Sequence, residues 1–232
     1  MSPSESALAV VVPVRNEARQ APALGRRLAA LAPASEIVVV DGGSDDDTVE
    51  LLRRHAPGLV VLRSPPGRAR QMNHGARATR AGVLLFLHAD TELPAAAPSL
   101  IAEAVGRGAG FGGFALHIES PDPRLRLAAR LITLRSRLLC SATGDQGIWV
   151  RRPLFEEVGG FPEVALCEDL ALVRRLSGRA PFALIEPPAR TSARRWERQG
   201  VMRTIALMWT IRIAFHLGVD PDRLARLYAE AR

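Results

Sequence analysis

Lysine is absent from this chain of 232 residues, so all 31 basic residues are arginine, and aromatic residues make up only 5%. The net charge of +7 would by itself suggest binding to nucleic acid or to a membrane surface. However, the arginines are scattered along the chain, and we find no nucleic-acid-binding motif or aromatic stacking platform. Composition therefore favours an anionic substrate such as a diphosphate, which the guanidinium fork suits, over a nucleic acid.

Cysteine and long apolar runs are also scarce. Cys140 and Cys167 lie far apart without metal-ligand spacing, which favours two reduced thiols and a cytoplasmic protein. Residues 1–6 lack the basic start and apolar stretch of a signal peptide. The most apolar segment, 201–217, is interrupted by two arginines, so it predicts a packed helix and not a membrane span. Its second interpretation is peripheral contact with the inner membrane face.

Strand-like and helix-like segments alternate through the first half of the chain. The predicted strands are 8–14, 37–40, 59–62 and 83–87, and the predicted helices are 17–31, 45–55 and 68–80. This alternation predicts βαβ units, and thus an α/β fold with a mainly parallel, Rossmann-like sheet flanked by helices.

The alternation breaks after residue 90. We expect helices at 93–105 (begun by Pro94), 123–139, 153–158, 167–176 and from Trp196 onward. The expected strands are 114–118 and 182–185. We also expect a mobile glycine-rich loop at 106–113, and a loop and short strand at 144–150. The length fits one domain. Within it we predict a nucleotide-binding half (1–92), an acceptor and catalytic half (93–195) and C-terminal helices (196–232).

Two of the predicted strands end abruptly in polar residues. The run 38–40 is followed by Asp41, Gly42 and Gly43, and the run 85–87 by His88, Ala89 and Asp90. In open α/β sheets, ligands bind at the carboxyl ends of the strands. The two endings therefore predict a nucleotide pocket beside a metal site.

Six short segments, in this order, resemble the family 2 glycosyltransferases of GT-A fold: 12–17, 40–44, 73–76, 88–90, 159–161 and 168–169. The resemblance covers nearly the whole chain. The His88-Ala89-Asp90 form and Arg194-Arg195-Trp196 are most similar to the small soluble transferases associated with radical-SAM and selenodomain proteins.

The resemblance implies a nucleotide pocket formed by Pro13, Val14, Arg15, Glu17, Asp41, Gly42, Arg68 and Ala89. Asp41 could accept hydrogen bonds from the base or ribose. The family commonly has a second acid where Gly42 stands, which leaves the identity of the base open. Arg68 would pair with the diphosphate or cap the base.

The family's metal signature is two acids that flank one residue, and here the first acid is replaced by His88. Asp90 then remains as the direct ligand of a divalent ion, Mn²⁺ or Mg²⁺, which one carboxylate and the substrate phosphates can hold. His88 is interpreted as a further ligand, a hydrogen-bond donor behind the ligand, or a contact to ribose.

The resemblance also implies a catalytic carboxylate at Asp169, with Glu168 as the fallback. The alternative is that both acids merely complement a helix dipole. The acceptor site would contain Asp145, Gln146, Gly160, Arg195 and Trp196. The glutamine that precedes the Arg-Trp pair in processive synthases is Ser192 here, so processive synthesis of a polymer is not expected.

The sequence therefore predicts an inverting, metal-dependent glycosyltransferase that uses a nucleotide-diphosphate sugar and a small-molecule or lipid-linked acceptor. One alternative is a sugar-phosphate nucleotidyltransferase, although the loop after the first strand lacks that class's glycines. The other is the basic nucleic-acid-binding protein suggested by charge alone.

Overall fold

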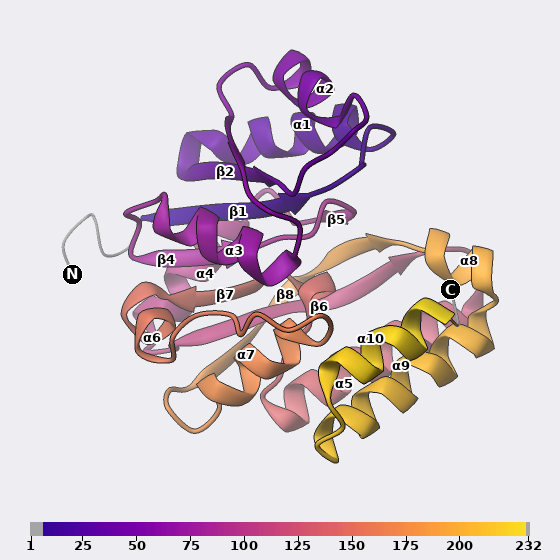
Figure 1. Cartoon of the computed structure of the whole chain (residues 1–232). Helices are drawn as coiled ribbons and strands as arrows, with labels where there is room; N and C mark the ends of the chain where they lie inside the picture. Colours follow the sequence, from indigo (N-terminus) through magenta and orange to yellow (C-terminus); the bar gives the residue numbers. More distant parts are fainter. Residues whose placement is uncertain (1–6, 231–232) are drawn as a thin grey trace.

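A computed structural model describes residues 7–230, apart from the side chains of Arg195, Arg198, Gln199 and Glu230 (Figure 1). The strands are β1 (Leu8–Val14), β2 (Ser35–Asp41), β3 (Val60–Arg63), β4 (Val83–Phe86), β5 (Thr91–Glu92), β6 (Phe111–Glu119), β7 (Ile148–Arg151) and β8 (Phe182–Ser192). The helices are α1 (Ala21–Leu31), α2 (Thr48–His55), α3 (Arg68–Arg77), α4 (Ala97–Gly106), α5 (Pro123–Leu139), α6 (Arg152–Glu157), α7 (Glu168–Leu176), α8 (Arg194–Gln199), α9 (Val201–His216) and α10 (Pro221–Glu230), with 3-10 turns η1 (Ala32–Ala34) and η2 (Gly144–Gln146).

The strands form one sheet in the order β3-β2-β1-β4-β7-β6-β8-β5. The first four strands are parallel to one another, as the alternation predicted. β7 is antiparallel to both of its neighbours, β4 and β6, while β6 and β8 are parallel. The α/β class is therefore confirmed, with a sheet that is mixed in its second half. This sheet continues across the predicted boundary at residue 92.

β1 shows why the first half of the sheet is easy to recognise in the sequence. All seven of its residues are buried, because helices cover both faces of the sheet. Val10 packs into a core with Leu24 of α1, whereas Val11 packs on the opposite face with Met72 of α3. Alternate residues of β1 thus pack in two separate cores, one on each face of the sheet.

The C-terminal helices α9 and α10 lie beside α5 at one end of the molecule (Figure 1). Ile211 and Phe215 of α9 pack with Leu224 of α10 and Leu170 of α7. This packing confirms the expected packed helix, and no helix in the described residues is long and apolar enough to cross a membrane.

Several predicted boundaries were wrong. The helices expected at 17–31 and 45–55 begin at Ala21 and Thr48. Three further differences lie after residue 90. The expected mobile loop at 106–113 is partly strand, because β6 begins at Phe111. Gly112 is buried there, and an added Cβ would lie 2.0 Å from the carbonyl oxygen of Ala183, so this glycine permits close strand packing. The helix expected from Pro94 begins at Ala97, after Thr91 and Glu92 form β5. The strand expected at 182–185 continues to Ser192 beside β6.

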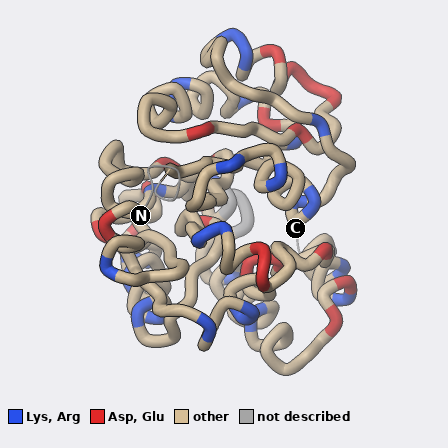
Figure 2. Tube along the Cα trace, turned by 90° about the vertical axis from the view of Figure 1, so that its left-hand side faces the viewer, with Lys and Arg blue, Asp and Glu red and all other residues tan. Residues whose placement is uncertain are grey.

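Acidic and basic residues are interspersed along the trace (Figure 2). Several arginines are held in exposed ion pairs, such as Arg54 with Glu50 and Arg137 with Glu186. The positive net charge is therefore distributed over the molecule, as its scatter in the sequence indicated. Both cysteines are free thiols.

Candidate active site

The candidate site forms where the chain leaves β4 and enters β7. Phe86, the last residue of β4, pairs with Ile148, the first of β7, in antiparallel register. The residues that follow β4 therefore lie beside the residues that precede β7. In this way His88 and Asp90 meet Asp145 of η2, although Asp145 is more than fifty residues away in the sequence.

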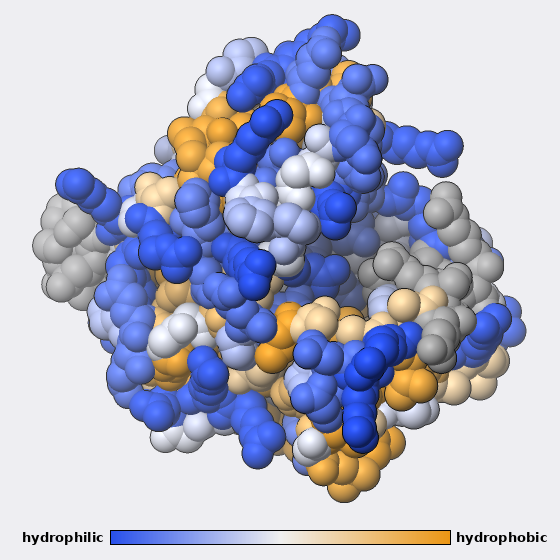
Figure 3. Space-filling model, viewed as in Figure 1, coloured by the Kyte–Doolittle hydropathy of each residue, from blue (hydrophilic) through white to orange (hydrophobic). Residues whose placement is uncertain are grey.

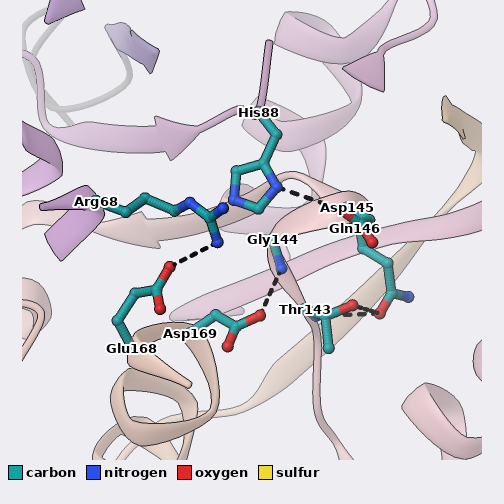
Figure 4. Close-up of polar contacts among 8 residues, drawn as sticks. All are labelled: Arg68, His88, Thr143, Gly144, Asp145, Gln146, Glu168 and Asp169. Carbon is teal, nitrogen blue, oxygen red and sulfur yellow. Dashed lines mark hydrogen bonds and ion pairs between the residues drawn. The ribbon is translucent and has the colours of Figure 1, made fainter. Parts of the chain in front are cut away.

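His88, Asp90 and Asp145 offer ligand atoms that all lie within 4.8 Å of one another. The Nδ1 atom of His88 is 3.2 Å from Oδ1 of Asp145 (Figure 4). Both side chains are partly exposed, at 16% and 29%. Two carboxylates and one imidazole form a donor set that fits a divalent cation and leaves room for phosphate oxygens. The structure thus places Asp145 with the metal candidates, whereas the sequence suggested a contact with the acceptor.

Gly144 connects this cluster to α7. A Cβ added to Gly144 would lie 2.1 Å from Cε1 of His88, so the imidazole ring lies directly against the glycine. On its other side, the backbone N–H of Gly144 donates a hydrogen bond of 2.9 Å to Oδ2 of Asp169 (Figure 4). One residue therefore contacts both the metal candidates and the predicted catalytic carboxylate.

The two acids at the start of α7 have different environments. Glu168 is buried, with 5% of its side chain exposed, and pairs with Nη1 of Arg68 at 3.0 Å. Asp169 accepts hydrogen bonds from two backbone amides, those of Gly144 and Leu170. The Glu168 carboxylate is thus engaged by Arg68, while the two backbone amides fix the orientation of the Asp169 carboxylate.

The predicted nucleotide loops are linked to each other. The N–H of Asn16 donates to Oγ of Ser44 at 2.9 Å, and the N–H of Glu17 donates to Oγ1 of Thr48 at 2.7 Å. Asp41 is fully buried and accepts hydrogen bonds from the N–H and hydroxyl of Ser44. Its carboxylate therefore shapes the loop, and the contact with a base or ribose that the sequence suggested would require this arrangement to open.

The other predicted nucleotide residues surround these loops. Pro13, Val14 and Gly42 are buried, Arg15 is exposed and Glu17 is partly buried. A Cβ at Gly42 would lie 2.9 Å from the side chain of Gln71, which in turn donates to the carbonyl oxygen atoms of Val14 and Val40. Gly42 is thus explained by the close approach of α3.

Three of the predicted acceptor residues have packing roles. Gln146 is fully buried, and its carboxamide bonds Phe114 and the Thr143 amide, so it shapes η2. Gly160 has a φ of +70°, and a Cβ there would lie 2.7 Å from Oδ1 of Asn73. Trp196 packs in a core cluster with β6 and α5. The contacts of these three residues are thus with the protein itself, their role toward an acceptor stays a prediction, and the side chain of Arg195 lies outside the described residues.

Three arginines that the sequence did not single out lie close to the site. Nη2 of Arg27 donates a hydrogen bond of 2.9 Å to the carbonyl oxygen of Ala89 and thereby stabilises the turn between His88 and Asp90. Arg135 of α5 and Arg212 of α9 contact the segment that contains η2. Arg135 and Arg212 lie in helices that are far apart in the sequence, so their proximity to the site depends on how α5 and α9 pack.

The surface view shows a hollow between α3 and the C-terminal helices, with mainly hydrophilic residues around it (Figure 3). Its position corresponds to the carboxyl ends of the parallel strands. An open polar hollow at this edge suits a charged ligand more than an apolar one.

The sheet order and this edge site define a GT-A protein, that is, an α/β fold with a mixed sheet flanked by helices. The sequence profile of the glycosyl transferase family 2 matches residues 9–150, which is more than half of the chain. The chain therefore belongs to glycosyl transferase family 2. A search of curated proteins found no match by sequence.

Solved glycosyltransferase structures share the fold. The mannosyltransferase PcManGT from Pyrobaculum calidifontis, in complex with GDP-Man and Mn²⁺, is 20% identical with a TM-score of 0.69, over 97% of this chain and 68% of that one. S. aureus TarS 1-349 in complex with UDP-GlcNAc is 16% identical with a TM-score of 0.64, over 80% of this chain. The chain spans 39 to 64% of the TarS structures that it matches.

Proposed function

We propose that this protein is an inverting, metal-dependent glycosyltransferase that moves a sugar from a nucleotide-diphosphate donor to an acceptor hydroxyl. The observation that carries the proposal is the junction at Gly144. This residue contacts His88 of the candidate metal cluster and binds Asp169 through its N–H. A diphosphate held by a metal at this cluster would therefore lie close to a carboxylate base at Asp169, as sugar transfer requires.

His88, Asp90 and Asp145 would hold the divalent ion, Mn²⁺ or Mg²⁺. When bound, such an ion neutralises charge that develops on a leaving diphosphate. The similar structure of PcManGT contains GDP-Man and Mn²⁺, which supports a divalent ion, and that of TarS contains UDP-GlcNAc, which supports a nucleotide-sugar donor. The loops that contain Arg15 and Asp41 would bind the nucleoside.

Asp169 is the proposed general base. In inverting transfer, a carboxylate removes the proton of the acceptor hydroxyl as that oxygen attacks the anomeric carbon. Asp169 is favoured over Glu168 because Glu168 is buried in its ion pair with Arg68. Arg68 is still 48% exposed, so its remaining donors can reach a diphosphate.

The remaining expectations also belong to the proposal. Membership of the radical-SAM-associated subgroup rests on the His88-Ala89-Asp90 and Arg194-Arg195-Trp196 sequences alone. A cytoplasmic location rests on the free cysteines. Peripheral contact with the inner membrane face is supported by Met202, Trp209 and Ile213, which α9 leaves exposed.

The test is thermal stability measured against a panel of nucleoside diphosphates with Mn²⁺, with Mg²⁺ and with a chelator. We expect stabilisation by one nucleotide that depends on the metal, lost in Asp90→Asn and kept in Asp169→Asn. Both variants should lose transfer, Asp169→Asn by about 10²- to 10⁴-fold, the range for a general base. Equal loss of nucleotide binding in both variants would contradict the role of Asp169. Release of pyrophosphate in place of a nucleoside diphosphate would identify a nucleotidyltransferase instead.

A further inference from the structure

Two arginines from different helices meet at the segment that joins α5 to β7. Nη2 of Arg135 lies 3.1 Å from Oγ of Ser136 and 3.3 Å from Oε1 of Gln146. Nη2 of Arg212, on α9, lies 3.2 Å from Oγ of Ser141. The N–H of Ser141 in turn donates to the carbonyl oxygen of Ser136, so these contacts form one continuous group.

In the described part of the chain, neither of these arginines forms an ion pair with a carboxylate. The hydrogen-bond partners of their Nη2 atoms are a neutral amide and neutral hydroxyl groups. The Nε atom of Arg135 is buried and has no hydrogen-bond partner among the described residues. A partly buried guanidinium is normally in contact with a counterion, because removing its hydration is costly. Among the described residues, neither arginine of this pair has a carboxylate in direct contact.

The electrostatics agree with this geometry. Burial lowers the pKa of Arg135 to about 10, and repulsion from Arg212 adds to the effect. Burial likewise lowers the pKa of Arg212. In both cases the charge of Asp169 acts in the opposite direction, so this carboxylate lies near the pair although it bonds to neither arginine.

We propose that Arg135 and Arg212 together bind a phosphate group of the acceptor whose hydroxyl is activated at Asp169. Two guanidinium groups match the two charges and several oxygens of a phosphate monoester. The location fits an acceptor, because Arg135 contacts Gln146 of η2 and Gly144 of η2 contacts Asp169. The donor diphosphate would lie on the other side of Gly144, at His88. The inference rests on the proposed function and specifies the class of acceptor.

A phosphate at this position has two sources, a soluble phosphate ester or a lipid headgroup. The surface beside the pair is relevant to this choice. On α5, which contains Arg135, one face exposes leucines at helical spacing: Leu127, Leu131, Leu134 and Leu138. A bilayer with phosphate headgroups would contact this face, whereas a soluble ester would not need it.

The test is calorimetric titration of the full chain with inorganic phosphate in the presence of a chelator, which disables the donor site. We expect Arg135→Gln and Arg212→Gln each to weaken binding by at least tenfold, and Arg212→Lys to keep part of the affinity. Arg130→Gln, at an exposed arginine of α5, is the matched control and should bind as the unmodified protein does. Circular dichroism establishes that each variant is folded.

Two results would overturn the inference: no phosphate binding by the unmodified protein, or loss of binding in Arg68→Gln with full binding in the variants of Arg135 and Arg212. Glycerol phosphate and vesicles of phosphatidylcholine with or without phosphatidic acid then distinguish the two sources. Metal-dependent stabilisation by a nucleoside diphosphate is measured in the same variants. If it persists while phosphate binding fails in the unmodified protein, the acceptor inference is wrong and the proposed transferase function stands.

Discussion

The substitution Gly144→Ala is a sharp test of the candidate site, because it adds one methyl group between the candidate metal ligand His88 and the proposed base Asp169. The added Cβ would lie 2.1 Å from Cε1 and 2.3 Å from Nε2 of His88. Carbon atoms in ordinary contact are about 3.5–4.0 Å apart, so the ring must move by more than about 1 Å. That movement breaks its contact of 3.2 Å with Asp145.

Overpacking of this kind costs about 1–3 kcal/mol. For a chain of this length, each kcal/mol lowers the melting temperature by about 2–4 °C, so we expect a fall of about 2–12 °C. Loss of the orientation of a metal ligand typically weakens binding about 10- to 100-fold. Mn²⁺ affinity, measured by electron paramagnetic resonance of the free ion, should fall within this range.

Two further variants serve as controls. Gly106→Ala, where an added Cβ meets nothing within 4 Å, should leave Mn²⁺ affinity unchanged. His88→Ala in the Gly144→Ala background should restore the lost stability, because the clashing ring is gone, while Mn²⁺ affinity stays low. If Gly144→Ala keeps both its melting temperature and its Mn²⁺ affinity, the arrangement of His88 against Gly144 is refuted.

Two other predictions follow from buried groups near the site. Asn73→Ala removes two hydrogen bonds, of 2.8 and 2.9 Å, to the backbone of Phe161. The free energy of unfolding, measured by urea denaturation, should therefore fall by about 1–3 kcal/mol. An unchanged midpoint would argue against this link between α3 and the 159–161 turn. Burial raises the pKa of Cys167 from 9.0 to about 12, and the charges of Asp169 and Glu168 add to the effect. Iodoacetamide at pH 8 should therefore modify the exposed Cys140 and leave Cys167 unmodified. Peptide mass spectrometry measures both modifications. Because the unfolded chain loses this thiol proton near pH 9 and the folded chain near pH 12, this group's contribution to stability should decline between those values.

Much of the first half of the fold could be predicted from the sequence. β1 and β4 are buried on both faces, so their apolar runs are continuous and their endings at Val14 and Phe86 are abrupt. The apolar stripe predicted α5 with both boundaries correct, and the structure shows Asp122 as its N-cap and Pro123 as its first residue. The apolar runs and the start of α5 depend on residues that are adjacent in the sequence, so they can be predicted without knowledge of the tertiary structure.

The composition of the metal cluster could not be predicted in full. His88 and Asp90 follow a strand directly, but Asp145 joins them only because β7 enters the sheet antiparallel to β4. No periodicity in the sequence indicates which strand will be inserted between β4 and β6. The meeting of Arg135 and Arg212 likewise depends on how α9 packs beside α5, which is a property of the tertiary structure.

The same short segment, 141–146, contacts the candidate metal ligands, the proposed base and the two arginines of the proposed anion site. Its Asp145 belongs to the metal cluster, its Gly144 binds Asp169, and its Ser141 and Gln146 contact the two arginines. Groups that share one backbone segment cannot move independently, so substitutions at His88, Asp169 and Arg135 should show effects that are not additive. A displacement of about 1 Å far from the chemistry can cost about 10²-fold in rate. We therefore expect this segment, more than any single side chain, to set the relative positions of the proposed metal ligands, the proposed base and the proposed anion site.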